Sequence, residues 1–275
     1  MEQDTNREYL KKLLDFLRDR ILSIPGNQWF AKELYKLLAP TSDARISDIH
    51  EQCIESILAQ QANEFYKDFV ITTIRPQLIA DFIKMEHWRR RNNIQEFCLA
   101  LYQQIEGIVN YLGADETLNQ IWSNIRNAAF FIDINAKDIR VRGNGKSIEQ
   151  SIIYKPEKYT NRPELKDLVA MDKFKAILFL VVYQTNVHWY NKSAFNDDFF
   201  LGQNIYRARN LNHRGNNEDL TEGLKSIIEM PTYSMCNILG FYARFIVGIN
   251  KGYPVSKSLV ELAEQCCQSY NKFHE

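Results

Sequence analysis

The sequence predicts an all-α protein, and three observations support this. Glycine and proline are scarce, at 11 and 7 of 275 residues, which favours long helices over many short strands. Apolar residues recur at spacings of three and four along most of the chain. Residues 128–147 alone combine strict alternation with turn residues, as paired strands do. We therefore expect a helical bundle with one small β-hairpin insertion.

The first 75 residues predict a small helical region. Pro25-Gly26-Asn27 and Pro40 interrupt its apolar pattern, and Pro76 marks the next boundary. Three helices are expected between these breaks, over about 5–23, 28–38 and 43–73. The sequence therefore predicts a helical N-terminal region at 1–75 and a bundle domain at 76–275.

The second region predicts several long helices. A broad apolar stripe from Ile94 to Leu112 is typical of a helix with one buried face, and the basic stretch HWRRRNN precedes it. The apolar run Ala176–Tyr183 suggests a fully buried helix. Asp197-Asp198 is expected to open another helix, because acidic residues suit the positive end of the helix dipole. The expected ranges are 77–112 (one or two helices), 115–127, 164–191, 197–213, 219–250 and 255–273.

The hairpin is expected at about 128–147. FFIDI and DIRVRG are two short runs separated by Asn135-Ala136-Lys137. Ile139 and Val141 alternate with polar residues, which is the period of a strand with one buried face.

Composition limits the classes of function. The 34 lysines and arginines balance 34 aspartates and glutamates, so no global field attracts nucleic acid, and any phosphate-binding surface must be local. The longest apolar run is too short to span a bilayer, and the charged N-terminus does not resemble a signal peptide. Five cysteines without a CxxC pair favour reduced thiols. We expect a cytoplasmic protein with no membrane partner.

Three familiar kinds of site find little support. RGNGKS at 142–147 resembles a phosphate-binding loop, but Arg140 stands where that loop needs glycine. His50 and Cys53 lie three apart, yet two ligands do not make a zinc site. There is no GxSxG and no cysteine in an activating context. We expect neither a metal nor a cofactor.

The stretch YRARNLNHRGN, residues 206–216, carries the strongest signal. At about 100° per residue, Arg209 and His213 share one face of a helix, with Asn210 at its border and Arg207 well round from it. A guanidinium can hold a phosphate and neutralise growing charge, and an imidazole can move a proton near neutral pH. These residues suit metal-free cleavage of RNA. A plainer explanation is that arginines favour the negative end of a helix and that glycine and asparagine cap it.

The same stretch resembles the signature of the HEPN superfamily (higher eukaryote and prokaryote nucleotide-binding domains), an arginine followed by four to six residues and a histidine. Arg207 and His213 have five residues between them, whereas Arg209 is followed by the preferred polar residue but has only three. Either arginine could therefore be the catalytic one. The resemblance implies a bundle of four or five helices whose first helix carries an acidic residue near the site, here Glu106.

The resemblance also implies a function, and many members of this superfamily are ribonucleases in prokaryotic defence and toxin systems. We expect a metal-independent endoribonuclease with His213 as acid and base, Arg207 or Arg209 and Asn210 on the phosphate, and Arg214, Asn212 and Glu106 contacting RNA. A homodimer would build one composite active site, and a defence-system partner protein is possible. The alternatives are a non-catalytic nucleotide- or RNA-binding module and a helical scaffold or adaptor.

Overall fold

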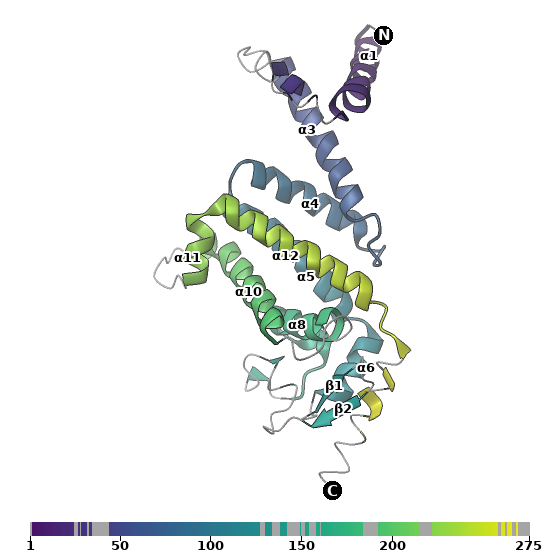
Figure 1. Ribbon diagram of the computed structural model, residues 1–275, viewed down its shortest axis with the longest axis vertical. Coiled ribbons are helices and arrows are strands. Elements are labelled where there is room, and N and C mark those ends of the chain that lie inside the picture. Colours follow the sequence, from purple (N-terminus) through teal and green to yellow (C-terminus); the bar gives the residue numbers. More distant parts are fainter. Residues whose placement is uncertain are drawn as a thin grey trace. The chain divides into compact units, whose positions relative to one another are not determined.

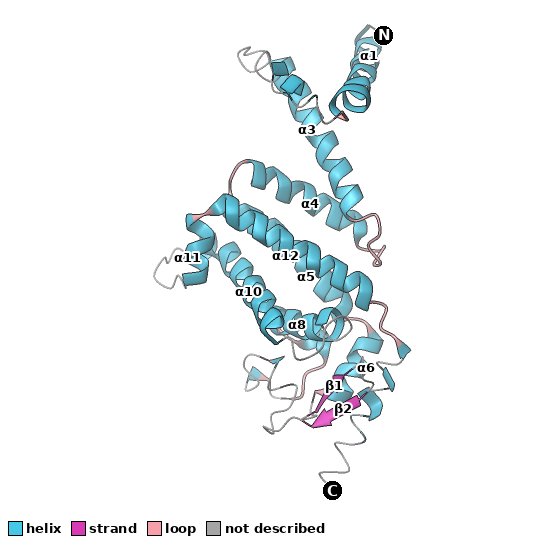
Figure 2. Cartoon of the chain, viewed as in Figure 1, coloured by secondary structure: helices cyan, strands magenta, loops and turns pink. Residues whose placement is uncertain are grey.

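The computed structural model describes most of the chain (Figure 1). The described residues are 2–24, 27, 29–31, 33–34, 44–126, 130–133, 138–141, 149, 152–153, 158–159, 161–183, 192–214, 222–257, 260–261, 263–265 and 268. Some of them, including 211–214, are described by their backbone alone. Figure 2 shows that this part of the protein is almost entirely helical, as the sequence predicts.

The chain divides into two compact units, Met1–Gln61 and Ala62–Glu275. In the first unit, α1 (Glu2–Phe16) continues into a short π-helix, η1 (Leu17–Leu22). Helix α3 (Ala44–Phe65) follows, and its last residues belong to the second unit. The helix expected over 28–38 lies largely outside the described residues.

The second unit contains the long helices. In chain order its helical elements are α4 (Arg75–Arg90), α5 (Ile94–Gly113), α6 (Glu116–Ile125), the 3-10 turn η4 (Leu165–Asp167), α8 (Ala170–Ile177), the π-helix η5 (Leu178–Tyr183), α10 (Lys192–Arg214), α11 (Glu222–Glu229) and α12 (Pro231–Gly252). Among these described elements no helix has the length and apolar character that a membrane crossing needs.

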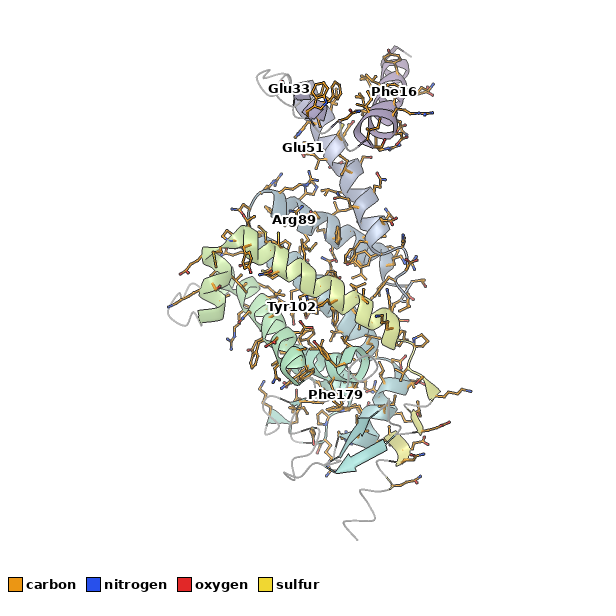
Figure 3. All side chains as sticks on the ribbon, viewed as in Figure 1. Phe16, Glu33, Glu51, Arg89, Tyr102 and Phe179 are labelled. Carbon is orange, nitrogen blue, oxygen red and sulfur yellow. The ribbon has the colours of Figure 1, made fainter. Side chains whose placement is uncertain are left out.

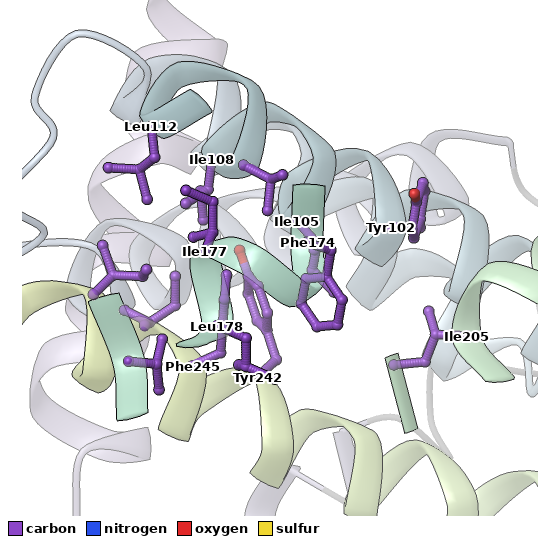
Figure 4. Close-up of a cluster of buried hydrophobic side chains, with 14 of the residues drawn as sticks. Tyr102, Ile105, Ile108, Leu112, Phe174, Ile177, Leu178, Ile205, Tyr242 and Phe245 are labelled. Atoms are coloured by element: carbon purple, nitrogen blue, oxygen red, sulfur yellow. The ribbon is translucent and has the colours of Figure 1, made fainter. Parts of the chain in front are cut away.

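Helix α5 lies at the centre of this unit, where it packs against α4, α8, α10 and α12. It begins at Asn93, whose side chain accepts a hydrogen bond from the backbone N–H of Glu96 at 3.2 Å. Its predicted apolar stripe is buried, and Figure 4 shows part of it packed against α8, α10 and α12. Burying one such side chain stabilises the fold by roughly 1.5–3 kcal/mol. The fully buried members include Phe97, Leu101, Ile108 and Leu112.

Two expected helices differ from those in the structure. The segment 164–191 was expected to be one helix, but its α-helix begins only at Ala170. Val169, after the 3-10 turn, has an extended backbone (φ −63°, ψ 155°) that separates the two. The helix expected over 219–250 is broken at Met230 (φ −125°, ψ 64°). Pro231 explains this second break, because proline lacks an N–H and disfavours a helical residue before it.

Helix α10 begins earlier than predicted, at Lys192, so Asp197 and Asp198 lie inside the helix rather than at its start. Asp198 instead accepts hydrogen bonds from the Tyr183 hydroxyl at 2.6 Å and from the Arg244 guanidinium at 2.9 Å. The aspartate therefore ties α10 to η5 and α12.

Two short strands follow α6. Strands β1 (Phe130–Asp133) and β2 (Asp138–Val141) pair antiparallel, with Phe130 opposite Val141 and Asp133 opposite Asp138. The residues between the strands lie outside the described part of the chain, and so does RGNGKS at 142–147.

Gly202 of α10 makes room for the ring of Phe174 from α8. A Cβ atom added at Gly202 would lie 2.5 Å from Cε1 of Phe174 and 2.7 Å from its Cζ, which is closer than real atoms approach. Phe174 is fully buried and contacts the ring of Phe199, so it has little room to move. The absence of a side chain at Gly202 therefore leaves room for the Phe174 ring against α10.

A chain of hydrogen bonds crosses the core beside α5. The Tyr66 hydroxyl donates to Oε1 of Gln104 at 2.6 Å and lies 2.6 Å from the Tyr242 hydroxyl. Because Tyr66 has one proton, Tyr242 must be the donor to Tyr66. The Gln104 amide donates in turn to the Ala100 carbonyl at 3.1 Å. All three side chains are buried, and each finds its partner inside the protein.

Candidate functional site

The end of helix α10 presents its arginines on either side of a buried stripe. Ile205 and Ala208 are buried, and they fix the face of α10 that points into the protein. Arg207 and Arg209 flank Ala208, so the two arginines are about 200° apart around the helix. The structure therefore separates the two arginines that the sequence leaves as alternatives.

Arg209 lies against helix α5. Its Nη1 is 3.5 Å from a carboxylate oxygen of Glu106, and its guanidinium carbon is 4.7 Å from the centre of the Tyr102 ring and 5.5 Å from that of the Tyr206 ring. The arginine side chain is 27% exposed and that of Glu106 is 37% exposed. The structure thus brings together two of the predicted site residues, Arg209 and Glu106, in a setting that solvent still reaches.

The two tyrosines form an aromatic support under the arginine. Their ring centres are 5.1 Å apart and the rings are inclined at 54°. Figure 3 labels Tyr102 on α5, and Figure 4 shows it toward Ile205 of α10, at the opposite end of the core cluster from Leu112. Burial raises the pKa of the Tyr102 hydroxyl well above its ordinary value, and the charge of Glu106 raises it further. Tyr102 therefore stays neutral beside the cation.

These contacts position Arg209 without using all of its hydrogen-bonding capacity. A cation over an aromatic face gains about 0.5–2 kcal/mol, and a solvent-accessible ion pair gains about 0–1 kcal/mol. The 3.5 Å separation from Glu106 is longer than a good hydrogen bond, and a guanidinium has five N–H donors. Among the residues that the structure describes, Glu106 is the one carboxylate paired with Arg209. The guanidinium can therefore still bind an anion.

His213 lies one turn beyond Arg209, within α10. Since α10 is helical to Arg214, His213 is about 40° round and about 6 Å further along the axis from Arg209. Arg207 is about 120° from His213 on the other side. The side chains of His213, Asn212 and Arg214 lie outside the described part of the structure, so their positions rest on the helical register alone.

The remaining predicted residues with described side chains are Asn210 and Arg207. Asn210 and Arg207 are both half-buried. Arg207 forms no ion pair with any side chain that the structure describes, and it lies on the opposite flank of the buried stripe from Arg209. The structure does not bring Arg207 and Glu106 together.

Tyr102 and Tyr206 are site residues that the sequence analysis does not single out. A signal for them exists, because Tyr102 precedes Glu106 by four residues and Tyr206 precedes Arg209 by three. Those spacings put an aromatic and a charged side chain on the same face of each helix. The signal becomes specific only once the packing of α5 against α10 is known.

No metal centre is evident within the described ranges, where no group of three or more His, Cys, Asp and Glu side chains is placed to hold an ion. Of the pair that the sequence suggested, His50 and Cys53 are both half-buried, and burial raises the pKa of the Cys53 thiol. A raised pKa disfavours the thiolate that a metal needs.

Comparison of the chain with protein-family models gave no match, and comparisons with curated proteins and with solved structures also gave none. Arg209, Glu106, Tyr102 and Tyr206 together form the Arg209 cluster.

Proposed function

We propose that the protein is a metal-independent endoribonuclease of the HEPN type, with its active site at the end of α10. The observation that carries this proposal is the Arg209 guanidinium, held over two tyrosine rings and beside Glu106, one helical turn before His213. An oriented cation can stabilise charge on a phosphate and an imidazole can move a proton, and both steps assist cleavage of a ribose-phosphate linkage.

The reaction is an attack of the ribose 2′-oxygen on the neighbouring phosphorus. The 2′-oxygen–phosphorus bond forms, the bond from phosphorus to the 5′-oxygen breaks, and the products carry a 2′,3′-cyclic phosphate and a 5′-hydroxyl. One proton leaves the 2′-hydroxyl and one reaches the departing 5′-oxygen. His213 carries the proton, and Arg209 stabilises the charge that grows on the phosphate. Asn210 orients the phosphate group.

The helical register favours Arg209 over Arg207 as the phosphate ligand. Only Arg209 shares a face with His213 in a helix that continues to Arg214. Glu106 and the tyrosines hold the guanidinium against α5. A bound phosphate would then compete with Glu106, which explains the use of a weak, solvent-accessible ion pair here.

The wider proposal follows the resemblance of the motif. The second unit would be a HEPN-like bundle with the β1–β2 pair as an insertion. Two copies would meet with their α10 ends together, so that Arg214 and Asn212 of both complete one cleft for RNA. A role in prokaryotic defence or as a toxin, with a partner protein of that system, belongs to the same proposal. Sedimentation showing a strict monomer at high concentration would contradict the dimer.

The deciding experiment compares His213→Ala with wild type on an unstructured RNA in the presence of a chelator. We expect cleavage to fall by about 10²–10⁴, the usual contribution of a general acid–base group. The wild-type products should carry 5′-hydroxyl ends that a kinase can label, and RNA with 2′-O-methyl riboses should resist cleavage. His50→Ala, a half-buried histidine of α3, is the matched control and should cleave normally.

Activity that survives His213→Ala, or that needs added metal, rules out this mechanism. Binding of the same RNA should be nearly unchanged in His213→Ala, which separates loss of chemistry from loss of fold.

One observation favours a second candidate, a non-catalytic RNA- or nucleotide-binding module of the same fold. Glu106 offsets the charge of Arg209, and a site tuned for binding tolerates that better than one that stabilises a transition state. This candidate predicts RNA binding that depends on Arg209, with no cleavage by the wild type. A helical adaptor would bind no RNA at all.

A further inference from the structure

The turn between α4 and α5 carries two exposed arginines that the proposed active site does not use. Helix α4 ends in His87, Trp88, Arg89 and Arg90, and Arg91 forms its C-cap. Arg89 is neutralised, because its Nε and Nη2 lie 2.7–2.9 Å from the buried carboxylate of Glu86. Arg90 and Arg91 are exposed and form no ion pair with a side chain that the structure describes.

The backbone of this turn is fixed by hydrogen bonds. Asn92 has a left-handed backbone, with φ of 54°, and its N–H donates to the Arg89 carbonyl at 3.1 Å. The N–H of Asn93 donates to the Trp88 carbonyl at 3.0 Å. The Thr232 hydroxyl, in the first turn of α12, donates to Oδ1 of Asn92 at 3.2 Å. The two arginines therefore project from a rigid support rather than from a loose loop.

Two further features at this turn favour an anionic, aromatic ligand. Helix α12 begins beside it at Pro231 with no side-chain cap, so the positive end of its dipole adds to the two guanidinium charges. The ring of Trp88 lies 5.5 Å from the Arg91 guanidinium, and Tyr233, next to Thr232, is 65% exposed. Cations interleaved with aromatic rings bind single-stranded nucleic acid through its phosphates and bases.

The turn lies at the same end of the bundle as the end of α10. Helix α11 contacts both α10 and α12, and the first turn of α12 contacts Asn92. Figure 1 shows α11, the start of α12 and the α4–α5 turn gathered at one end of the second unit. From Asn93 to Tyr102 along α5 is nine residues, or about 14 Å. A strand of a few nucleotides can span that separation.

We propose that Arg90, Arg91, Trp88 and Tyr233 form a second contact surface for single-stranded RNA, on which the strand lies beyond the Arg209 cluster. This inference rests on the proposed function for its ligand, but it concerns residues outside the active site. The surface binds phosphate through the two arginines and stacks a base on the exposed ring of Tyr233, while Trp88 supports Arg91.

The test uses the full chain carrying His213→Ala, so that RNA is bound and not cut, and a fluorescent oligouridine as the probe. Arg90→Glu/Arg91→Glu should weaken binding at least about tenfold at about 50 mM salt. Arg90→Gln/Arg91→Gln, the milder variant, should make the slope of log affinity against log salt shallower by about 1.4, because each lost phosphate contact on a single strand removes about 0.7. Tyr233→Ala should weaken binding about fivefold and leave the slope unchanged.

Lys251→Glu/Lys257→Glu is the matched control, since it reverses two exposed charges in the last turn of α12 and just after it, and should bind like the parent. The proposal is overturned if the arginine variants keep the parental affinity and salt slope, or if the lysine control loses as much affinity as they do. Loss of binding to anionic phospholipid vesicles with unchanged binding of RNA would also overturn it, in favour of a membrane surface.

The outcome is separable from that of the nuclease proposal. A wild type that cuts RNA while the arginine variants bind it normally keeps the nuclease and removes this surface. If the wild type cuts no RNA but binds it in a way that depends on Arg90 and Arg91, the nuclease proposal fails and this surface is kept.

Discussion

Helix α5 carries two polar clusters on opposite sides, and they differ in how completely their groups are paired. Gln104 belongs to the buried chain of Tyr66 and Tyr242, in which every hydroxyl and amide has a partner inside the protein. Tyr102 and Glu106 lie about 160–200° round the helix from Gln104 and belong to the Arg209 cluster. Solvent reaches this cluster, and the described residues leave donors of Arg209 without a partner. A closed network stabilises a fold, whereas an open one can exchange a partner for a ligand.

The sharpest test of this difference is Arg209→Ala. Activity on RNA should fall by about 10²–10³, as for the loss of one transition-state donor, while the free energy of unfolding changes by less than about 1 kcal/mol. Arg209→Lys keeps the charge but loses the planar fork and should recover only part of the activity. Cleavage assays and denaturant unfolding measure the two effects. A large loss of stability with normal cleavage would show that Arg209 is structural.

The opposite result is expected on the other side of the helix. Gln104→Leu removes the acceptor of the buried Tyr66 hydroxyl proton and should lower the free energy of unfolding by about 2 kcal/mol. RNA cleavage, measured well below the unfolding transition, should be nearly unchanged. If Gln104→Leu instead abolished cleavage at full stability, the division between a structural and a functional side of α5 would be wrong.

The closed network also makes the stability of the protein depend on pH. Burial raises the pKa of both Tyr66 and Tyr242 well above the ordinary tyrosine value of 10.0. Below that value both hydroxyls are protonated in the folded and the unfolded chain, so they cause no pH dependence. Above it the unfolded chain loses protons that the folded chain keeps, so stability falls by about 1.4 kcal/mol per pH unit for each tyrosine.

Unfolding in denaturant between about pH 9 and 11 measures this decline, and Tyr66→Phe/Tyr242→Phe should make it shallower. A decline of equal steepness in the double variant would show that other groups cause it.

The smallest effect is expected for Tyr102→Phe in the open cluster. The Tyr102 hydroxyl contacts only a sulfur, that of Met171 at 4.0 Å, among the described residues, whereas the ring supports Arg209. Removing the hydroxyl should change stability and cleavage by less than about 0.5 kcal/mol. Tyr102→Leu removes the aromatic face and should raise the KM for RNA more than it lowers kcat. Equal effects of the two substitutions would show that the ring is not what holds Arg209.

The helical fold class and the buried face of α5 could be predicted from the sequence, because both depend on local periodicity. The stripe from Ile94 to Leu112 fixes which face is buried, whatever packs against it. Breaks were harder to predict. The turn at Asn92 needs a left-handed backbone, which asparagine permits but does not require. At Pro231 the apolar periodicity on both sides suggested one continuous helix, although proline interrupts it.

The candidate site could be predicted from the sequence only in part. The sequence pointed to Arg209 and Glu106, which lie on different helices 103 residues apart in the chain, and the structure brings them together. It could not choose between Arg207 and Arg209, because that choice depends on how far α10 continues as a helix. It also missed Tyr102 and Tyr206, since an aromatic support is visible only after two helices have been packed.

Gly202 lies seven residues before Arg209, on nearly the same face of α10, and it contacts the Phe174 ring with no side chain of its own. Any larger residue there would have to displace the Phe174 ring, about 10 Å along α10 from Arg209. Packing at Gly202 therefore connects the core of the protein to the helix that carries Arg209.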